Sequence, residues 1–168
     1  MSVRARPGAA PHAAAFDAIV SAPFGALGVR APGAIVEEIV FLESGPAMAA
    51  RTTAAAAAVR QIEAYLDDPR SGFDLPLAPS GTPFRRRVWS AIRDIACGRT
   101  RTYGQIAADL GSAARAVGQA CGDNPLPLVV PCHRVVAANG PGGFAHSAAG
   151  FHQTVKQWLL AHEARAYP

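Results

Sequence analysis

The sequence contains few cysteines and no long apolar run. Its three cysteines, Cys97, Cys121 and Cys132, form an odd set without CxxC spacing, and residues 1–96 contain none. This argues against a disulfide framework or a Cys-rich zinc site, and it favours reduced thiols in a cytoplasm. No window approaches the roughly 20 apolar residues that span a bilayer, and residues 1–11 do not resemble a secretory signal. We therefore expect a cytoplasmic protein with no metal site and no membrane partner.

Charged residues are also scarce, at 17% of 168 residues, while half of the chain is hydrophobic. Such a composition argues against wholesale disorder and can bury a real core. Residues 1–80 hold six Arg and eight acidic residues, a net −2, whereas residues 81–168 hold nine Arg, the only lysine and four acidic residues, a net +6. The basic back half predicts binding to nucleic acid or another polyanion, and an Arg-rich solvated surface is the alternative.

The front half, residues 1–80, predicts a small α/β scaffold domain. We expect strands at residues 15–21, 25–30 and 34–42, a helix at 47–67, and a linker rich in Pro, Gly and Ser at 69–82. The strands are short and adjacent, so they favour an antiparallel sheet backed by the helix. No catalytic constellation is visible in this half.

The back half, residues 81–168, predicts a mainly α-helical domain. Thr82 and Pro83 open an amphipathic helix that we expect to end at Gly98. Two shorter helices follow, one within residues 102–111 that ends in Leu-Gly and one at 113–121 with Ser112 as the cap, and the last helix spans 154–164. The two shorter helices form a candidate helix-turn-helix, whose second helix usually meets a DNA groove.

The second helix of this pair is made of small residues, and Arg115 is its only charged one. Such a helix can approach a groove closely, but it carries few side chains that read base edges. One long cation among small residues therefore favours insertion into a base stack over sequence-specific recognition.

Cys132 and His133 form the candidate reactive pair. A free thiol is only a few per cent ionised at neutral pH, so a reactive cysteine needs a base, here His133, helped by the charge of Arg134. Adjacent residues of an extended chain point to opposite sides, so contact requires a turn or a bridging water. The imidazole needs an orienting acid, and the candidates downstream of Cys97 are Asp109, Asp123 and Glu163. A buried structural cysteine remains the alternative.

Several motifs in this half resemble the O6-alkylguanine-DNA alkyltransferase family (methylated-DNA–protein-cysteine methyltransferases). The hallmark is Pro-Cys-His-Arg-Val at residues 131–135. The other matching segments, in the family's order, are residues 81–89, 97–98, 102–107, 114–118, 124–125, 156–160 and 162–163. Together they cover about half of the chain, residues 81–164.

The resemblance implies a role for each matching residue in a single-turnover repair reaction without a cofactor. Cys132 is then the alkyl acceptor, His133 the base acting through a water, and Glu163 the acid that orients it. Asn124 braces the turn ahead of the cysteine, and Arg134 joins the residues that bind substrate or DNA. Tyr103 helps to swing the nucleotide out, Arg115 fills the vacated place in the stack, and the Val135 backbone helps to hold the guanine. The partner is double-stranded DNA with alkylated guanine, chiefly O6-methylguanine and secondarily O4-methylthymine, and the protein is expected to be a monomer.

One segment departs from the family pattern. Gly142-Gly143-Phe144 replaces a Gly-Tyr motif, and the segment of residues 145–153 is a few residues longer than its counterpart in the family. In the family this loop covers the pocket and contacts the guanine oxygen. No residue here matches that contact, although Ser147 is a candidate, so the preference among alkyl groups stays open.

Three other functions fit parts of the pattern. An alkyltransferase-like lesion sensor, which binds damaged bases without repairing them, lacks the acceptor cysteine, so Cys132 argues against it. A transcription factor would need base-reading side chains on the second helix. A cysteine hydrolase would need an oxyanion-hole motif, which is not apparent.

Overall fold

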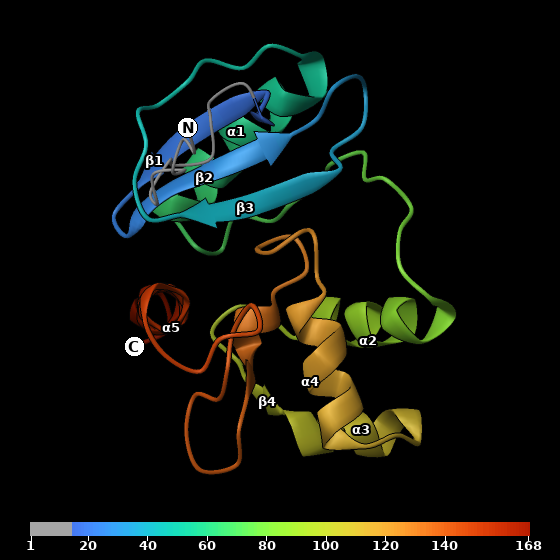
Figure 1. Ribbon diagram of the computed structural model, residues 1–168. Helices are drawn as coiled ribbons and strands as arrows, with labels where there is room; N and C mark the ends of the chain where they lie inside the picture. The colour runs from blue at the N-terminus through green and yellow to red at the C-terminus, as the bar shows by residue number, and fades with distance from the viewer. Residues whose placement is uncertain (1–14) are drawn as a thin grey trace, which may run out of the picture.

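The computed structural model describes residues 15–168, and the expectation for residues 1–11 lies outside them. The front half forms an antiparallel sheet of three strands in the order β1-β2-β3, Ala18–Ala22, Gly25–Arg30 and Glu38–Leu42. Helix α1, Thr53–Asp67, packs against this sheet (Figure 1). The expected α/β fold of this half is therefore confirmed.

Two boundaries in the front half differ from the sequence-based expectation. The third strand begins at Glu38 rather than at residue 34, because Val36 pairs instead with the segment before α2, through hydrogen bonds with Pro76 and Ala78. Helix α1 begins at Thr53 rather than at residue 47. Thr52 caps it by accepting from the Ala55 N–H at 3.1 Å, while Met48 is held in a bridge to β1.

The back half is mainly helical, as predicted. Its helices are α2, Pro83–Arg93; α3, Tyr103–Leu110; α4, Ala114–Gly122; and α5, Phe151–Arg165. The two-residue strands β4, Arg101–Thr102, and β5, Val135–Val136, pair in parallel, and a 3₁₀ turn, η2, spans Cys132–Arg134. Helix α5 begins three residues earlier than expected. Figure 1 shows this half as a second layer, in which α3 lies farther from the sheet than α2 and α5 do.

Helix α2 ends at Arg93, five residues before the predicted stop at Gly98. The Ile95 carbonyl accepts from the Arg134 guanidinium at 2.7 Å, so the chain there serves a tertiary contact instead of another helical turn. Gly98 instead lies in the following turn at φ +76°, in the left-handed region, where it also packs closely against Tyr167.

Helices α3 and α4 pack on each other and form the predicted helix-turn-helix. The Thr102 hydroxyl and the Gln105 side chain form a capping box at the start of α3, and Gly111 ends that helix at φ +62°. Ser112 does not cap α4, because its N–H bonds back to the Ala107 carbonyl and closes α3. Ala113 takes the cap position without a side-chain bond.

One hydrophobic cluster runs through both halves of the molecule. Phe24 on the front half lies against Trp158 on α5 with ring centroids 5.3 Å apart, and Phe41 on β3 lies 5.5 Å from Phe144. The Ile39 N–H donates to the Pro125 carbonyl at 2.9 Å. The sheet therefore supports the loop that leads to Cys132. Within residues 15–168, no helix has the length and apolar character needed to cross a membrane.

Candidate active site

A cavity of about 460 Å³ lies between the helix-turn-helix and the loop that precedes α5. Tyr103, Arg115 and Cys121 line one side of it, and residues 143–148 line the other. The Cys132 side chain also lines the cavity, although the residue is only 3% exposed. A substrate group that enters the cavity therefore reaches a thiol that bulk solvent barely touches.

Asn124 holds the loop ahead of Cys132 in place. Its amide nitrogen donates to the Val130 carbonyl at 2.9 Å and to Cys132 Sγ at 3.2 Å, and its oxygen accepts from the Leu126 N–H at 2.9 Å. Leu128 in this loop has φ +73°, which lies in the left-handed region that a residue with a bulky side chain such as leucine rarely adopts. The three bonds of Asn124 fix a turn that the backbone alone would not prefer.

The turn η2 directs His133 away from the cavity and toward α5. His133 Nε2 lies 2.7 Å from Glu163 Oε1, and both side chains are almost completely buried. Because an ionised carboxylate only accepts hydrogen bonds, Nε2 carries the proton and Nδ1 has the lone pair. Nδ1 is buried and has no protein partner among residues 15–168. Burial lowers the pKa of His133 against the opposing effect of Glu163, so the ring is a neutral base at neutral pH.

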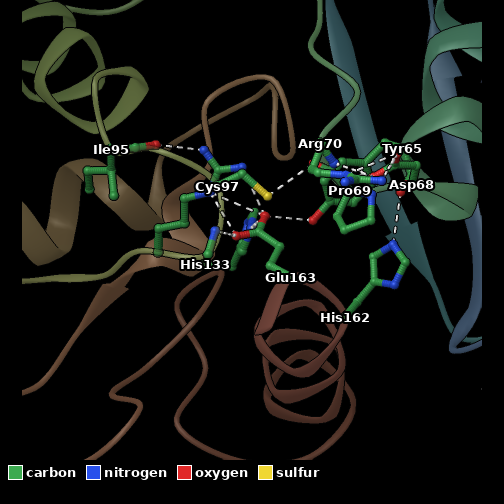
Figure 2. A network of polar contacts seen from close by, with 11 residues as sticks. Tyr65, Asp68, Pro69, Arg70, Ile95, Cys97, His133, His162 and Glu163 are labelled. Carbon is green, nitrogen blue, oxygen red and sulfur yellow. Dashed lines mark hydrogen bonds and ion pairs between the residues drawn. The ribbon is translucent and has the colours of Figure 1, made fainter. Parts of the chain in front are cut away.

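Glu163 is the centre of a buried polar network, shown in Figure 2. Besides His133, its carboxylate accepts from the Tyr65 hydroxyl at 2.8 Å, the Gly98 N–H at 3.1 Å, and the Arg134 guanidinium at 2.9 and 3.0 Å. Burial raises the pKa of Glu163, but the bonds from His133 and Arg134 outweigh it and hold the pKa well below its usual range. The carboxylate is therefore ionised at neutral pH.

Glu163 is the only one of the three candidate acids that reaches His133. Asp109 pairs with Arg101 at 2.7 Å, and Asp123 at the end of α4 pairs with Arg85 and with His146. These two acids serve surface contacts, so the site has a single orienting carboxylate.

Arg134 lies in the Glu163 network and not on the cavity wall. Its guanidinium bonds to Glu163 and to the Ile95 carbonyl, and its side chain is 12% exposed. The expected contact of Arg134 with substrate or DNA has no support in this geometry. Nor does its charge sit beside the Cys132 thiol, as the sequence pattern had implied, because the guanidinium faces Glu163.

The Cys132 thiol is protonated at rest. A hydrogen bond with Cys121 and burial both raise its pKa, and the Asn124 amide opposes them only in part. Cys121 lines the same cavity and so contacts the site. The reaction at Cys132 therefore depends on a base that removes its proton.

Lys156, the only lysine, is completely buried on α5. Its ammonium donates to the Val135 carbonyl at 2.7 Å and the Gly143 carbonyl at 2.8 Å, and it lies 3.4 Å from the Tyr103 hydroxyl. Burial lowers its pKa to about 8. The Tyr103 hydroxyl also donates to the Gly143 carbonyl at 3.1 Å. Lys156 thus joins β5, the cavity loop and α3 at one point.

The other predicted residues lie at different depths. Arg115 is exposed at the cavity and has no hydrogen-bond or ion-pair partner within the part of the chain that the structure describes. Val135 is buried, and both its backbone groups are already bonded, to Cys132 and Lys156. Ser147 is on the cavity wall, where its hydroxyl donates to the Ala149 carbonyl at 2.7 Å.

Sequence reasoning missed Tyr65 and Lys156. Lys156 had a signal, because a lone lysine between apolar positions of an amphipathic helix in an Arg-rich chain is unusual. Tyr65 had none, since it lies 98 positions before Glu163 in a half without recognisable chemistry.

The comparisons with known proteins agree on one family. Residues 83–165 match the family described as 6-O-methylguanine DNA methyltransferase, DNA binding domain. A protein of Methanosarcina acetivorans named methylated-DNA–protein-cysteine methyltransferase is 52% identical over 85 residues, which are 49% of this chain and 54% of the relative. One of the same name from Mycolicibacterium paratuberculosis is 46% identical over 115 residues, 67% of each chain. The chain spans about half the length of the first of these curated relatives.

The fold has solved counterparts in the same family. The crystal structure of the Mycobacterium tuberculosis O6-methylguanine methyltransferase has a TM-score of 0.74 and 34% identity, covering 89% of this chain and 93% of its own. A structure of Mycobacterium tuberculosis OGT in complex with DNA has a TM-score of 0.73 and 35% identity, with the same coverage.

Proposed function

Since the chain belongs to the methylated-DNA–protein-cysteine methyltransferase family, we propose that it repairs DNA by transferring the alkyl group of O6-alkylguanine to Cys132. The observation that carries this proposal is the position of the thiol. Cys132 lines a cavity beside a helix-turn-helix, and a neutral His133 paired with Glu163 lies behind it. The DNA complex of a protein 35% identical supports DNA as the partner.

The buried histidine supplies the base that the protonated thiol needs. The unpartnered Nδ1 of His133 takes the proton of Cys132 through a water, and Glu163 stabilises the resulting imidazolium. The thiolate attacks the alkyl carbon, the S–C bond forms as the C–O6 bond breaks, and O6 keeps the bonding pair. The departing guanine takes up one proton, which balances the proton that the thiol gave to His133. The thioether product is a poor leaving group, so each molecule acts once.

Access to the lesion requires base flipping. An alkyl group inside a duplex cannot reach a thiol within a cavity, and extrusion of the nucleotide costs a few kcal/mol. Arg115, which is exposed on α4 and unpaired within residues 15–168, would fill the vacated place in the stack. Tyr103, on the same side of the cavity as Arg115, would help to turn the nucleotide and bind the purine. O6-methylguanine is the main substrate that we propose, with O4-methylthymine as a second.

The experiment uses duplex DNA with a labelled methyl group on the guanine oxygen. We expect one methyl group per protein molecule, found on Cys132 by peptide mass spectrometry. Cys132→Ala should abolish the transfer and retain binding to the duplex, whereas Cys121→Ala should still accept the methyl group.

Label that stays on the DNA at stoichiometric protein would contradict the proposal. Retained binding without transfer would instead indicate a lesion-binding protein, the alternative function.

A further inference from the structure

We propose that Tyr65, on the last turn of α1 in the front half, is a positioning residue of the proton relay at Cys132. Its hydroxyl donates to Glu163 Oε1 at 2.8 Å, and the same oxygen accepts from His133 at 2.7 Å. The inference rests on the proposed function, and it extends the reactive machinery to a half of the chain in which the sequence showed none.

The phenol is held in place by packing as well as by its hydrogen bond. Tyr65 is 1% exposed, and its ring lies 5.7 Å from the ring of Phe73 and 5.6 Å from that of His162, centroid to centroid. His162 also bonds to the Tyr65 backbone carbonyl at 2.9 Å. Since Glu163 follows His162 on α5, this helix contacts α1 at two consecutive residues, and the hydroxyl has little freedom to leave Glu163.

In the hydrogen bond between Tyr65 and Glu163, the tyrosine is the donor. Burial and then Glu163 raise the pKa of Tyr65, so the phenol keeps its proton and always donates. A donor on Oε1 stabilises the carboxylate charge and weakens the pull of that oxygen on the His133 proton. Tyr65 thereby favours a neutral His133 with the proton on Nε2 and a free lone pair on Nδ1.

Other titratable and charged groups face this network and stay in place when only the hydroxyl is removed. Arg134 bonds to Glu163, the thiol of Cys97 influences the pKa of Tyr65, and Lys156 lowers that of His133. A hydroxyl-only substitution therefore changes one hydrogen bond in an otherwise constant electrostatic setting.

The test is Tyr65→Phe with Phe73→Leu as the matched control. The first variant removes the hydroxyl and keeps the ring, while the second disturbs the packing of the same ring and keeps the hydroxyl. Two rates are measured against pH: methyl transfer from duplex DNA, and carboxamidomethylation of Cys132 by iodoacetamide without DNA, followed by peptide mass spectrometry.

We expect Tyr65→Phe to lower both plateau rates about tenfold and to move the acidic limb of each profile to higher pH. The limb moves up because a more basic Glu163 stabilises the imidazolium, and a protonated His133 cannot act as a base. Phe73→Leu should lower the melting temperature and leave both limbs in place.

The proposal would be overturned if the acidic limb of the rate–pH profiles stayed in place in Tyr65→Phe, whether or not the plateau rate fell. An equal shift of that limb in Phe73→Leu would also overturn it. If the wild-type protein takes no methyl group from DNA, the proposed function fails, but the iodoacetamide profile still decides the role of Tyr65.

Discussion

The carboxylate of Glu163 accepts hydrogen bonds from three separate parts of the chain, namely α1, the turn after α2, and η2, which supplies both His133 and Arg134. A buried charge is tolerated only when its partners offset the loss of water. Here the offset comes from one positive group and several neutral donors, so Glu163 contributes to stability and to the orientation of His133 at once.

Glu163→Gln should destabilise the protein by about 3 kcal/mol, because it leaves the partly buried Arg134 without its counter-charge. The pKa of Glu163 is lowered in the folded state, so its stabilisation is present above the ordinary value of about 4.3 and is lost as pH falls below it. Urea unfolding is measured at about pH 7 and about pH 3.5, on either side of that value. The free energy of unfolding should fall more on acidification in the wild type than in Glu163→Gln. Equal losses in the two proteins would contradict the assignment.

At the scale of elements, the cavity depends on how the loop of residues 142–150 meets α4. His146 Nε2 lies 2.9 Å from Asp123 Oδ1, at the end of α4, and the His146 ring lies over Gly122. A Cβ on Gly122 would come within 2.3 Å of that ring. The loop that departs from the family pattern therefore contacts the end of α4 through the His146 side chain.

His146→Ala should widen the cavity mouth and raise the rate for a benzyl adduct relative to a methyl adduct, by about threefold, equivalent to less than 1 kcal/mol. Gly122→Ala should act in the same direction, because its methyl group displaces the His146 ring while His146 itself is retained. The ratio of the two single-turnover rates measures the effect, with duplex affinity as the control. A ratio unchanged in both variants would show that the loop contact does not govern alkyl-group size.

At the scale of the whole molecule, the two halves differ in charge and share one core. The +6 charge lies in the half that carries α3, α4 and the cavity, whereas the front half carries −2. The sheet contacts the back half through aromatic pairs and through Tyr65. The charge separation favours docking of DNA on the back half, while the front half stabilises the reactive centre from behind.

Arg115→Ala and Arg60→Ala change the charge equally but in different halves of the chain. Both side chains are exposed, Arg115 on α4 and Arg60 on α1. We expect Arg115→Ala to weaken duplex binding and to reduce the slope of log Kd against log salt by about one. Arg60→Ala should leave both unchanged, as measured by fluorescence anisotropy over a salt series. Equal effects of the two substitutions would contradict the docking of DNA at α4.

Local signals in the sequence predicted most of the elements and where several of them begin or end. The start of α2 at Thr82 and Pro83 was predictable because a cap acts on neighbours within one turn. The motif around Cys132 likewise named the thiol and the histidine, and the family resemblance as a whole pointed to Glu163.

Only the tertiary structure decided which groups meet. The bonding of Arg134 to Glu163 and the early end of α2 both depend on contacts between distant segments, and the structure supplies the His133–Glu163 contact that the family resemblance had implied. Tyr65 is the clearest case, because a hydrogen bond across 98 positions exists only after two helices pack. Sequence patterns act over a few residues, whereas the free energy that aligns a proton relay comes from burial of surfaces far apart in the chain.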